Sequence, residues 1–130
     1  MTAEISVPIS PGELIDKITI LEIKAARILD AAKIANVRTE LQLLESTWRS
    51  SPYAAHDITA EWSALRAINT KLWDIEDRIR DKERARKFDD EFIQLARAVY
   101  VTNDERAAIK RTINVKLGSR IIEEKSYAKY

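Results

Sequence analysis

The amino-acid sequence predicts an all-α protein, and three observations support this fold class. Ser10 and Glu13 stand three positions apart with Pro11 between them, a strong signal for the start of a helix. Apolar residues then recur at steps of three and four along most of the chain, as on one face of a helix. Two glycines and three prolines among 130 residues leave room for long helices. We therefore expect a single bundle-like helical domain, in which two shorter helices pack on two long antiparallel helices.

The helix that begins after Ser10 is apolar on two sides. Its first stripe consists of Leu14, Ile18, Leu21, Ala25, Ile28 and Ala32, and its second of Ile20, Ile23, Ala31 and Ile34. A helix with two apolar sides usually lies between neighbours, so we expect it to be central in the fold. The alternating, β-branched segment 17–20 would also suit a strand, but the longer pattern around it favours a helix.

This first long helix is predicted to continue beyond Ile34. Apolar residues from Val37 to Trp48 keep the spacing of three and four, but the stripe changes register near Asn36. Asparagine can end one helix or cap the next, so we expect a kink or a short break at that position.

A second long helix is predicted after the loop at residues 50–53, with Asp57 as its N-cap. Its apolar stripe consists of Ile58, Trp62, Leu65, Ile68, Leu72, Ile75 and Ile79. The charged run 80–87 follows this stripe, and we interpret it as a solvated helix end that is supported by charge pairs four residues apart.

Two shorter helices complete the predicted fold. Asp89 is expected to cap the third helix, with Phe88 and Ile93 packed around the cap as a hydrophobic staple. The segment Thr102–Glu105 has the pattern of a second capping box, so a fourth helix is predicted to start there and to end at Gly118.

The two ends of the chain lack the helical pattern. In residues 1–9, Ile5, Val7 and Ile9 alternate with other residues, which indicates an extended arm that lays one side on the body. Residues 119–130 are predicted to form a tail that is exposed or free to contact a partner.

The charge balance and composition narrow the function classes. Lysine and arginine number 22 against 21 aspartates and glutamates, and the net charge of +1 argues against a nucleic-acid binder. The absence of cysteine excludes thiol catalysis, disulfides and thiolate metal sites. No apolar run approaches the ~20 residues that span a membrane, and the N-terminal residues lack a signal-peptide pattern. We therefore expect a cytoplasmic protein without membrane, nucleic-acid, metal or cofactor binding.

Sequence motifs of enzymes are also missing. The chain has no P-loop, no Gly-rich dinucleotide motif, no zinc-protease motif and no nucleophile elbow. It has no Glu-x-x-His pair, which disfavours a di-iron bundle. The single histidine, His56, is expected to be solvated in a loop. No catalytic residue is therefore predicted.

Polar stripes on three of the predicted helices are candidate ligand-binding positions. Their residues are Asn69, Trp73, Glu76, Arg80, Arg97, Tyr100, Asn103, Arg106, Lys110 and Asn114. If the helices converge, these side chains form a cleft for an anion, because arginine makes bidentate hydrogen bonds to carboxylate or phosphate. The structural alternative is that Glu76 pairs with Arg80 and Arg97 meets Tyr100, so that these pairs lock the helices together.

Four segments resemble a bacterial family of short all-helical proteins that is a domain of unknown function. They are Ser10–Glu22, Leu72–Asp77, Thr102–Ala107 and Glu124–Tyr127. The resemblance covers nearly the whole chain, and it implies neither an activity nor a functional residue. It does imply a setting, because members of the family occur beside, or joined to, tetratricopeptide and glycosyltransferase proteins of surface-polysaccharide synthesis.

The sequence favours a non-catalytic interaction or accessory protein that acts as a homo-oligomer, with a dimer as the simplest form. The two-sided first helix supports this expectation, as do three tryptophans, of which Trp62 suits the core and Trp48 and Trp73 suit an interface. A further protein partner would fit the same role. The alternative is a small helical ligand-binding protein or enzyme acting on a phosphate or carboxylate compound, because such polar side chains can stabilise charge electrostatically.

Overall fold

The computed structural model describes residues 3–130. It contains four helices: α1 (Pro11–Arg27), α2 (Ala31–Arg49), α3 (Thr59–Arg84) and α4 (Asp90–Lys116). The other described residues form an N-terminal arm, the connections and a C-terminal tail, and no strand occurs within residues 3–130. The prediction of an all-α fold is confirmed for this part of the chain.

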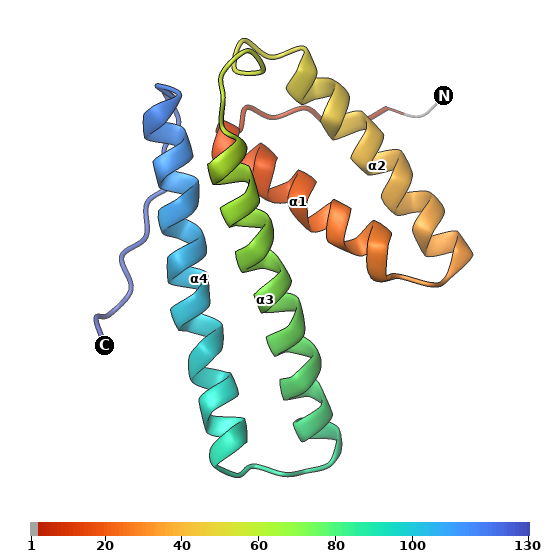
Figure 1. Ribbon diagram of the computed structural model, residues 1–130, viewed down its shortest axis with the longest axis vertical. Helices are drawn as coiled ribbons and strands as arrows, with labels where there is room; N and C mark the ends of the chain where they lie inside the picture. The colour runs from red at the N-terminus through yellow and green to blue at the C-terminus, as the bar shows by residue number, and fades with distance from the viewer. Residues whose placement is uncertain (1–2) are drawn as a thin grey trace.

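The helices are arranged around α1. Helices α3 and α4 lie side by side and run in opposite directions, while α1 crosses them and α2 lies on the outer side of α1 (Figure 1). α1 contacts each of the other three helices. The prediction that the helix after Ser10 is central is therefore confirmed, and its two apolar sides are explained by these neighbours.

The core lies where α1, α3 and α4 meet. Ile15, Leu65 and Ile113 are fully buried there, one from each helix. The loop before α3 adds Ile58, and α2 reaches this cluster through Trp48, which packs edge-on against another ring. Fully burying one such aliphatic side chain contributes about 1.5–3 kcal/mol, so this cluster is a main source of stability.

The break between the first two helices lies at a different place from the predicted one. α1 ends at Arg27 and α2 begins at Ala31, whereas Asn36 lies inside α2. Asp30 is the N-cap of α2, because its carboxylate accepts a hydrogen bond of 2.9 Å from the backbone N–H of Lys33. The predicted long first helix is therefore two helices that fold back on one another (Figure 1).

The predicted third and fourth helices are one helix, α4. The segment Thr102–Glu105 lies in its interior, and Thr102 is buried. A cap contributes only about 1 kcal/mol. Burial of Leu95 and Ile113, on either side of this segment, contributes more, so packing keeps the helix continuous. The two longest helices are consequently α3 and α4, with 26 and 27 residues.

Several helix ends follow the predicted signals. The Ser10 hydroxyl accepts a hydrogen bond from the N–H of Glu13, and the Asp89 carboxylate accepts one from the N–H of Phe92, both at 3.1 Å. Gly118 follows α4 with a φ of 67°, the left-handed conformation expected after a helix.

Two other capping contacts differ from the prediction. Asp57 lies one residue before the N-cap of α3, although its carboxylate still accepts a hydrogen bond from the N–H of Thr59 at 3.1 Å. The ring of Phe88 packs on Phe92, with centroids 5.1 Å apart, whereas Ile93 is exposed.

The arm is extended, as predicted, but it does not lie on the body of its own chain. Every residue from Ala3 to Ile9 is exposed. Ile5 is the extreme case, with 92% of its surface accessible. The first two residues of the predicted arm lie outside the described part of the chain.

The tail is extended and follows α4. Glu124 pairs with Arg111 at 3.0 Å, and the Tyr130 hydroxyl donates a hydrogen bond of 2.7 Å to Asp104. The predicted tail therefore contacts the body of the chain through exposed polar groups.

Arg86 offers a test of how α3 ends. Like Gly118, it occupies the left-handed region, with a φ of 53°, although it has a side chain. Arg86→Gly removes strain of about 1 kcal/mol, so chemical denaturation should report a free energy of unfolding that is higher by about 0.5–1 kcal/mol. Gly118→Ala is the matched control and should lower it, because the new methyl group meets no neighbour within 4 Å and only the backbone is strained. An unchanged or lower stability of Arg86→Gly would contradict this explanation.

Candidate functional site

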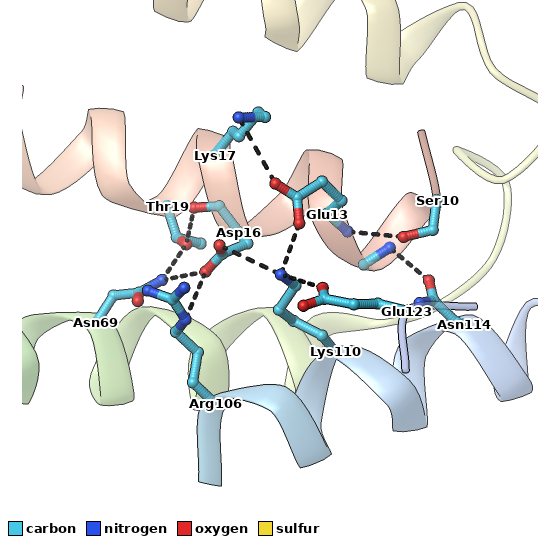
Figure 2. Close-up of polar contacts among 11 residues, drawn as sticks. Ser10, Glu13, Asp16, Lys17, Thr19, Asn69, Arg106, Lys110, Asn114 and Glu123 are labelled. Atoms are coloured by element: carbon cyan, nitrogen blue, oxygen red, sulfur yellow. Dashed lines mark hydrogen bonds and ion pairs between the residues drawn. The ribbon is translucent and has the colours of Figure 1, made fainter. Parts of the chain in front are cut away.

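Polar side chains from three helices and the tail meet beside the core, where α1 crosses α3 and α4 (Figure 2). We call this cluster the polar junction; it consists of Glu13, Asp16, Thr19, Asn69, Arg106, Lys110, Asn114 and Glu123. On α4 the junction residues are four positions apart, so they lie on one face.

Asp16 is the centre of the polar junction, and its side chain is only 5% exposed. The Asn69 amide donates a hydrogen bond of 2.9 Å to one carboxylate oxygen of Asp16. The guanidinium of Arg106 and the ammonium of Lys110 each lie 3.8 Å from this carboxylate (Figure 2). Asn69 also donates to the hydroxyl of Thr19 at 3.1 Å. These partners are needed, because a buried ion without compensation is several kcal/mol less stable than in water.

Lys110 joins α4 to α1 and to the tail. Its ammonium group donates hydrogen bonds to Glu13 at 2.6 Å and to Glu123 at 3.0 Å. Burial lowers the pKa of Lys110, but the hydrogen bonds to Glu13 and Glu123 and the charge of Asp16 outweigh it, so this pKa lies above its ordinary value. Lys110 is therefore a fixed cation at neutral pH.

Glu13 shows the complementary effect. Burial raises the pKa of its carboxyl group, but the hydrogen bond and charge of Lys110, together with Lys17, lower it below the ordinary value. The Glu13 carboxylate thus forms ion pairs with Lys17 and Lys110. In the predicted capping box it would instead accept a hydrogen bond from the backbone N–H of Ser10. Only the Ser10 half of that box is present among the hydrogen bonds of residues 3–130.

Gly12 allows α1 to approach α4 closely. Its N–H donates a hydrogen bond of 2.7 Å to the side-chain oxygen of Asn114, which is buried. A methyl group at this position would lie 2.6 Å from the backbone oxygen of Lys110, which is closer than real contacts allow. Glycine is therefore required here by space, and the polar junction depends on that close approach.

A groove of about 400 Å³ lies next to the polar junction, between α1, α3 and α4. Six of the predicted ligand-binding residues line it: Asn69, Trp73, Glu76, Arg80, Asn103 and Arg106. They meet because the stripes of α3 and α4 face the same side of the antiparallel pair. The predicted pair within α3 is present, since Arg80 donates to Glu76 at 3.1 Å.

The other four predicted residues do not line this groove. Lys110 and Asn114 belong to the polar junction, where their polar groups bind α1. Arg97 is exposed on α4. The ring of Tyr100 packs against Tyr130 of the tail, with centroids 5.1 Å apart. Arg106 thus belongs to both the groove and the polar junction, whereas Lys110 and Arg97 lie outside the groove, so the predicted basic residues do not form one continuous cationic pocket.

Two tryptophans pack within the chain, and the single histidine lies in a loop as predicted. Trp62 packs against the core, and its N–H donates a hydrogen bond of 3.3 Å to Glu22. The ring of Trp48 makes an edge-to-face contact with the ring of Trp62, so Trp48 takes part in packing within the chain. His56 is exposed in the loop before α3.

Sequence reasoning missed the α1 side of the polar junction. Asp16 and Thr19 were not predicted, because α1 was interpreted as an apolar helix. A signal was present, since both polar residues interrupt the apolar side that Ile20 and Ile23 continue. A charged residue inside an apolar stripe is unusual and indicates a buried partner.

Within residues 3–130, no helix is long and apolar enough to cross a membrane. In the same part of the chain, no three or more His, Cys, Asp or Glu side chains lie close enough together to hold a metal ion.

The fold and the site define a small all-α protein of four helices whose first helix is fixed by buried ion pairs. The chain belongs to a family of unknown function, DUF6165, which it matches over residues 5–130. The predicted membership in a domain of unknown function is thereby confirmed. No curated protein and no solved structure matches the chain.

The ion pair of Glu13 makes stability depend on pH in a defined direction. Because the folded-state pKa of Glu13 is lowered, its contribution is present above the ordinary value of 4.5 and is lost as pH falls below it. At pH 7, Glu13→Gln should lower the free energy of unfolding by roughly 1–2 kcal/mol, since charge-assisted hydrogen bonds are the stronger ones. The difference from the parent should shrink in denaturation curves recorded below pH 4.5. Glu4→Gln, in the exposed arm, is the control; a deficit of Glu13→Gln that stays constant with pH would contradict the assignment.

Proposed function

We propose that this protein is a non-catalytic interaction or accessory protein that works as a homo-oligomer, most simply as a two-fold dimer. The observation that carries the proposal is the area that the folded chain leaves open to solvent. It exposes 9170 Å². A compact monomer of 14.9 kDa would expose about 7,000 Å². The excess of about 2,000 Å² is more than the ~800 Å² that each partner contributes to a standard interface.

The open arrangement of the helices accounts for part of this area. α2 packs chiefly against α1 and stands apart from α4 (Figure 1). α2 reaches α3 through the ring of Trp48, which makes an edge-to-face contact with Trp62. In this proposal the long antiparallel pair of α3 and α4 is the frame, and α2 with the arm is the region that meets the second copy.

Exposed apolar residues support the same region. Ile5 and Val7 are 92% and 67% exposed in the arm, and Leu29 is 94% exposed at the turn between α1 and α2. Ile5 and Val7 are two positions apart, so an extended arm presents both on one side. An apolar side of this kind is suited to lie on another surface, and a second copy of this chain is the occupant that we propose.

The ionic groups favour a non-catalytic role. A general acid or base works best when its pKa lies near the working pH. Lys110 has its pKa moved away from neutrality, above the ordinary value, and its ammonium group is shared between Glu13 and Glu123. These groups are therefore better suited to hold helices together than to transfer protons.

The setting that we propose is the bacterial cytoplasm, with a protein of surface-polysaccharide synthesis as a further partner. This part of the proposal rests on the resemblance found in the sequence, which implies such neighbours for the family.

Self-association is tested by light scattering on the purified protein at concentrations on the order of tens of micromolar. We expect twice the chain mass of 14.9 kDa. The double variant Ile5→Ser/Val7→Ser should shift the mass to that of one chain, because it removes the apolar side of the arm. Ile121→Ser/Ile122→Ser, in the tail, is the control and should stay associated.

A parent protein that remains monomeric under these conditions would contradict the proposal. A parent that associates while the arm variant associates equally well would keep the oligomer and exclude the arm as its contact.

A further inference from the structure

The groove beside the polar junction has the dimensions of a small-molecule site. Its volume of about 400 Å³ lies within the range of roughly 300–1,000 Å³ that is usual for such sites. It is built on three packed helices, so its walls are supported by the core. What it could bind follows from the chemistry of its walls.

Part of the groove lining is apolar and includes an aromatic ring. Ile20, Ile23 and Leu72 contribute aliphatic surface, and Trp73 contributes its indole ring. Trp48 and Trp62 pack on each other, but no ring within residues 3–130 packs on Trp73. Trp73 is half-buried and lines the groove, so the accessible part of its indole can pack on a flat or cyclic organic group.

The rest of the groove lining is polar, with two amides and five charged side chains. Its cations are Lys24, Arg80 and Arg106, and its acids are Glu76 and Asp77, so three positive charges minus two negative charges leave +1. This balance suits one negative charge on a ligand. A more highly charged anion would be repelled by the two carboxylates.

Arg106 is the best placed of these cations. Its closest acid, Asp16, lies 3.8 Å from Nε, which is too long for a hydrogen bond. Its five N–H donors therefore have no hydrogen-bonded acceptor within residues 3–130. The side chain is 31% exposed, so part of it reaches the groove and solvent. Arg80, in contrast, already donates to Glu76.

We propose that this groove binds a small organic monoanion, a carboxylate on a ring, with the ring on Trp73 and the carboxylate on the guanidinium of Arg106. The amide of Asn103 lies in the same groove and supplies a further donor. Asp16, 3.8 Å from Nε of Arg106, attracts the guanidinium electrostatically without accepting a hydrogen bond from it. This site goes beyond self-association and does not depend on it.

The test follows the three tryptophan indole N–H signals by NMR during titration with benzoate. Trp73→Phe assigns the signal of Trp73. We expect benzoate to move that signal in a saturable way while the signals of Trp48 and Trp62 stay in place. A fragment of this size should have a dissociation constant on the order of 1–10 mM. Benzamide, which has the ring without the charge, and acetate, which has the charge without the ring, should each bind several-fold more weakly.

Substitutions of single basic residues test which side chain binds the carboxylate of benzoate. Arg106→Gln should weaken benzoate binding about tenfold or more, because it removes a charge-assisted bidentate contact. Arg97→Gln, on an exposed position of α4 away from the groove, is the matched control and should leave binding unchanged. Because Arg106 also neighbours Asp16, Lys24→Gln is a second variant outside the polar junction, and it should weaken binding two- to threefold without loss of helix signal.

Several results would overturn the site. They are an unmoved Trp73 signal, equal binding of benzamide and benzoate, or equal weakening by Arg97→Gln and Arg106→Gln. An unfolded Arg106→Gln together with unchanged binding to Lys24→Gln would also overturn it. None of these results bears on light scattering, so failure of the site and failure of the proposed oligomer are separate outcomes.

Discussion

The arrangement of the helices depends on the contacts that the buried carboxylate of Asp16 makes with α3 and α4. It receives a hydrogen bond from α3 through Asn69 and lies between Arg106 and Lys110 of α4. An apolar contact can slide along a helix, but a buried carboxylate is stable only where its partners are, so it fixes α1 in one position. Gly12 makes the approach possible, because any larger residue would collide with α4.

The sequence predicted the helical class and most helix ends, because these depend on neighbouring residues. Ser10, Asp89 and Gly118 act as the local rules require. The errors arose where packing outweighs a local signal of about 1 kcal/mol. Thr102 has the pattern of a cap but is buried within α4, whereas Asp30 was overlooked although it is a real cap, because the apolar spacing happens to continue across the turn.

The candidate site was predictable in part for a similar reason. Helical spacing alone places Asn69, Trp73, Glu76 and Arg80 on one face of α3, and they do line one groove with Arg106. Helical spacing does not show how far α4 is rotated about its axis. It therefore could not show that Arg97 and Tyr100 lie outside the groove. Nor does spacing within one helix indicate a contact across the chain, which is why the α1 residues of the polar junction were missed.

The claim that Asp16 and its α4 partners act as one unit is tested most directly by a double-mutant cycle. Asp16→Asn, Lys110→Met and the double variant are compared with the parent by chemical denaturation. Each single change should lower the free energy of unfolding by roughly 1–3 kcal/mol, because it removes one charge from the polar junction. The remaining charge keeps other partners, since Arg106 still faces Asp16, and Glu13 and Glu123 still accept hydrogen bonds from Lys110. If the two side chains act as one unit, the double variant should lose less free energy of unfolding than the two single losses add up to, by at least about 1 kcal/mol. Losses that add up without any coupling would contradict it.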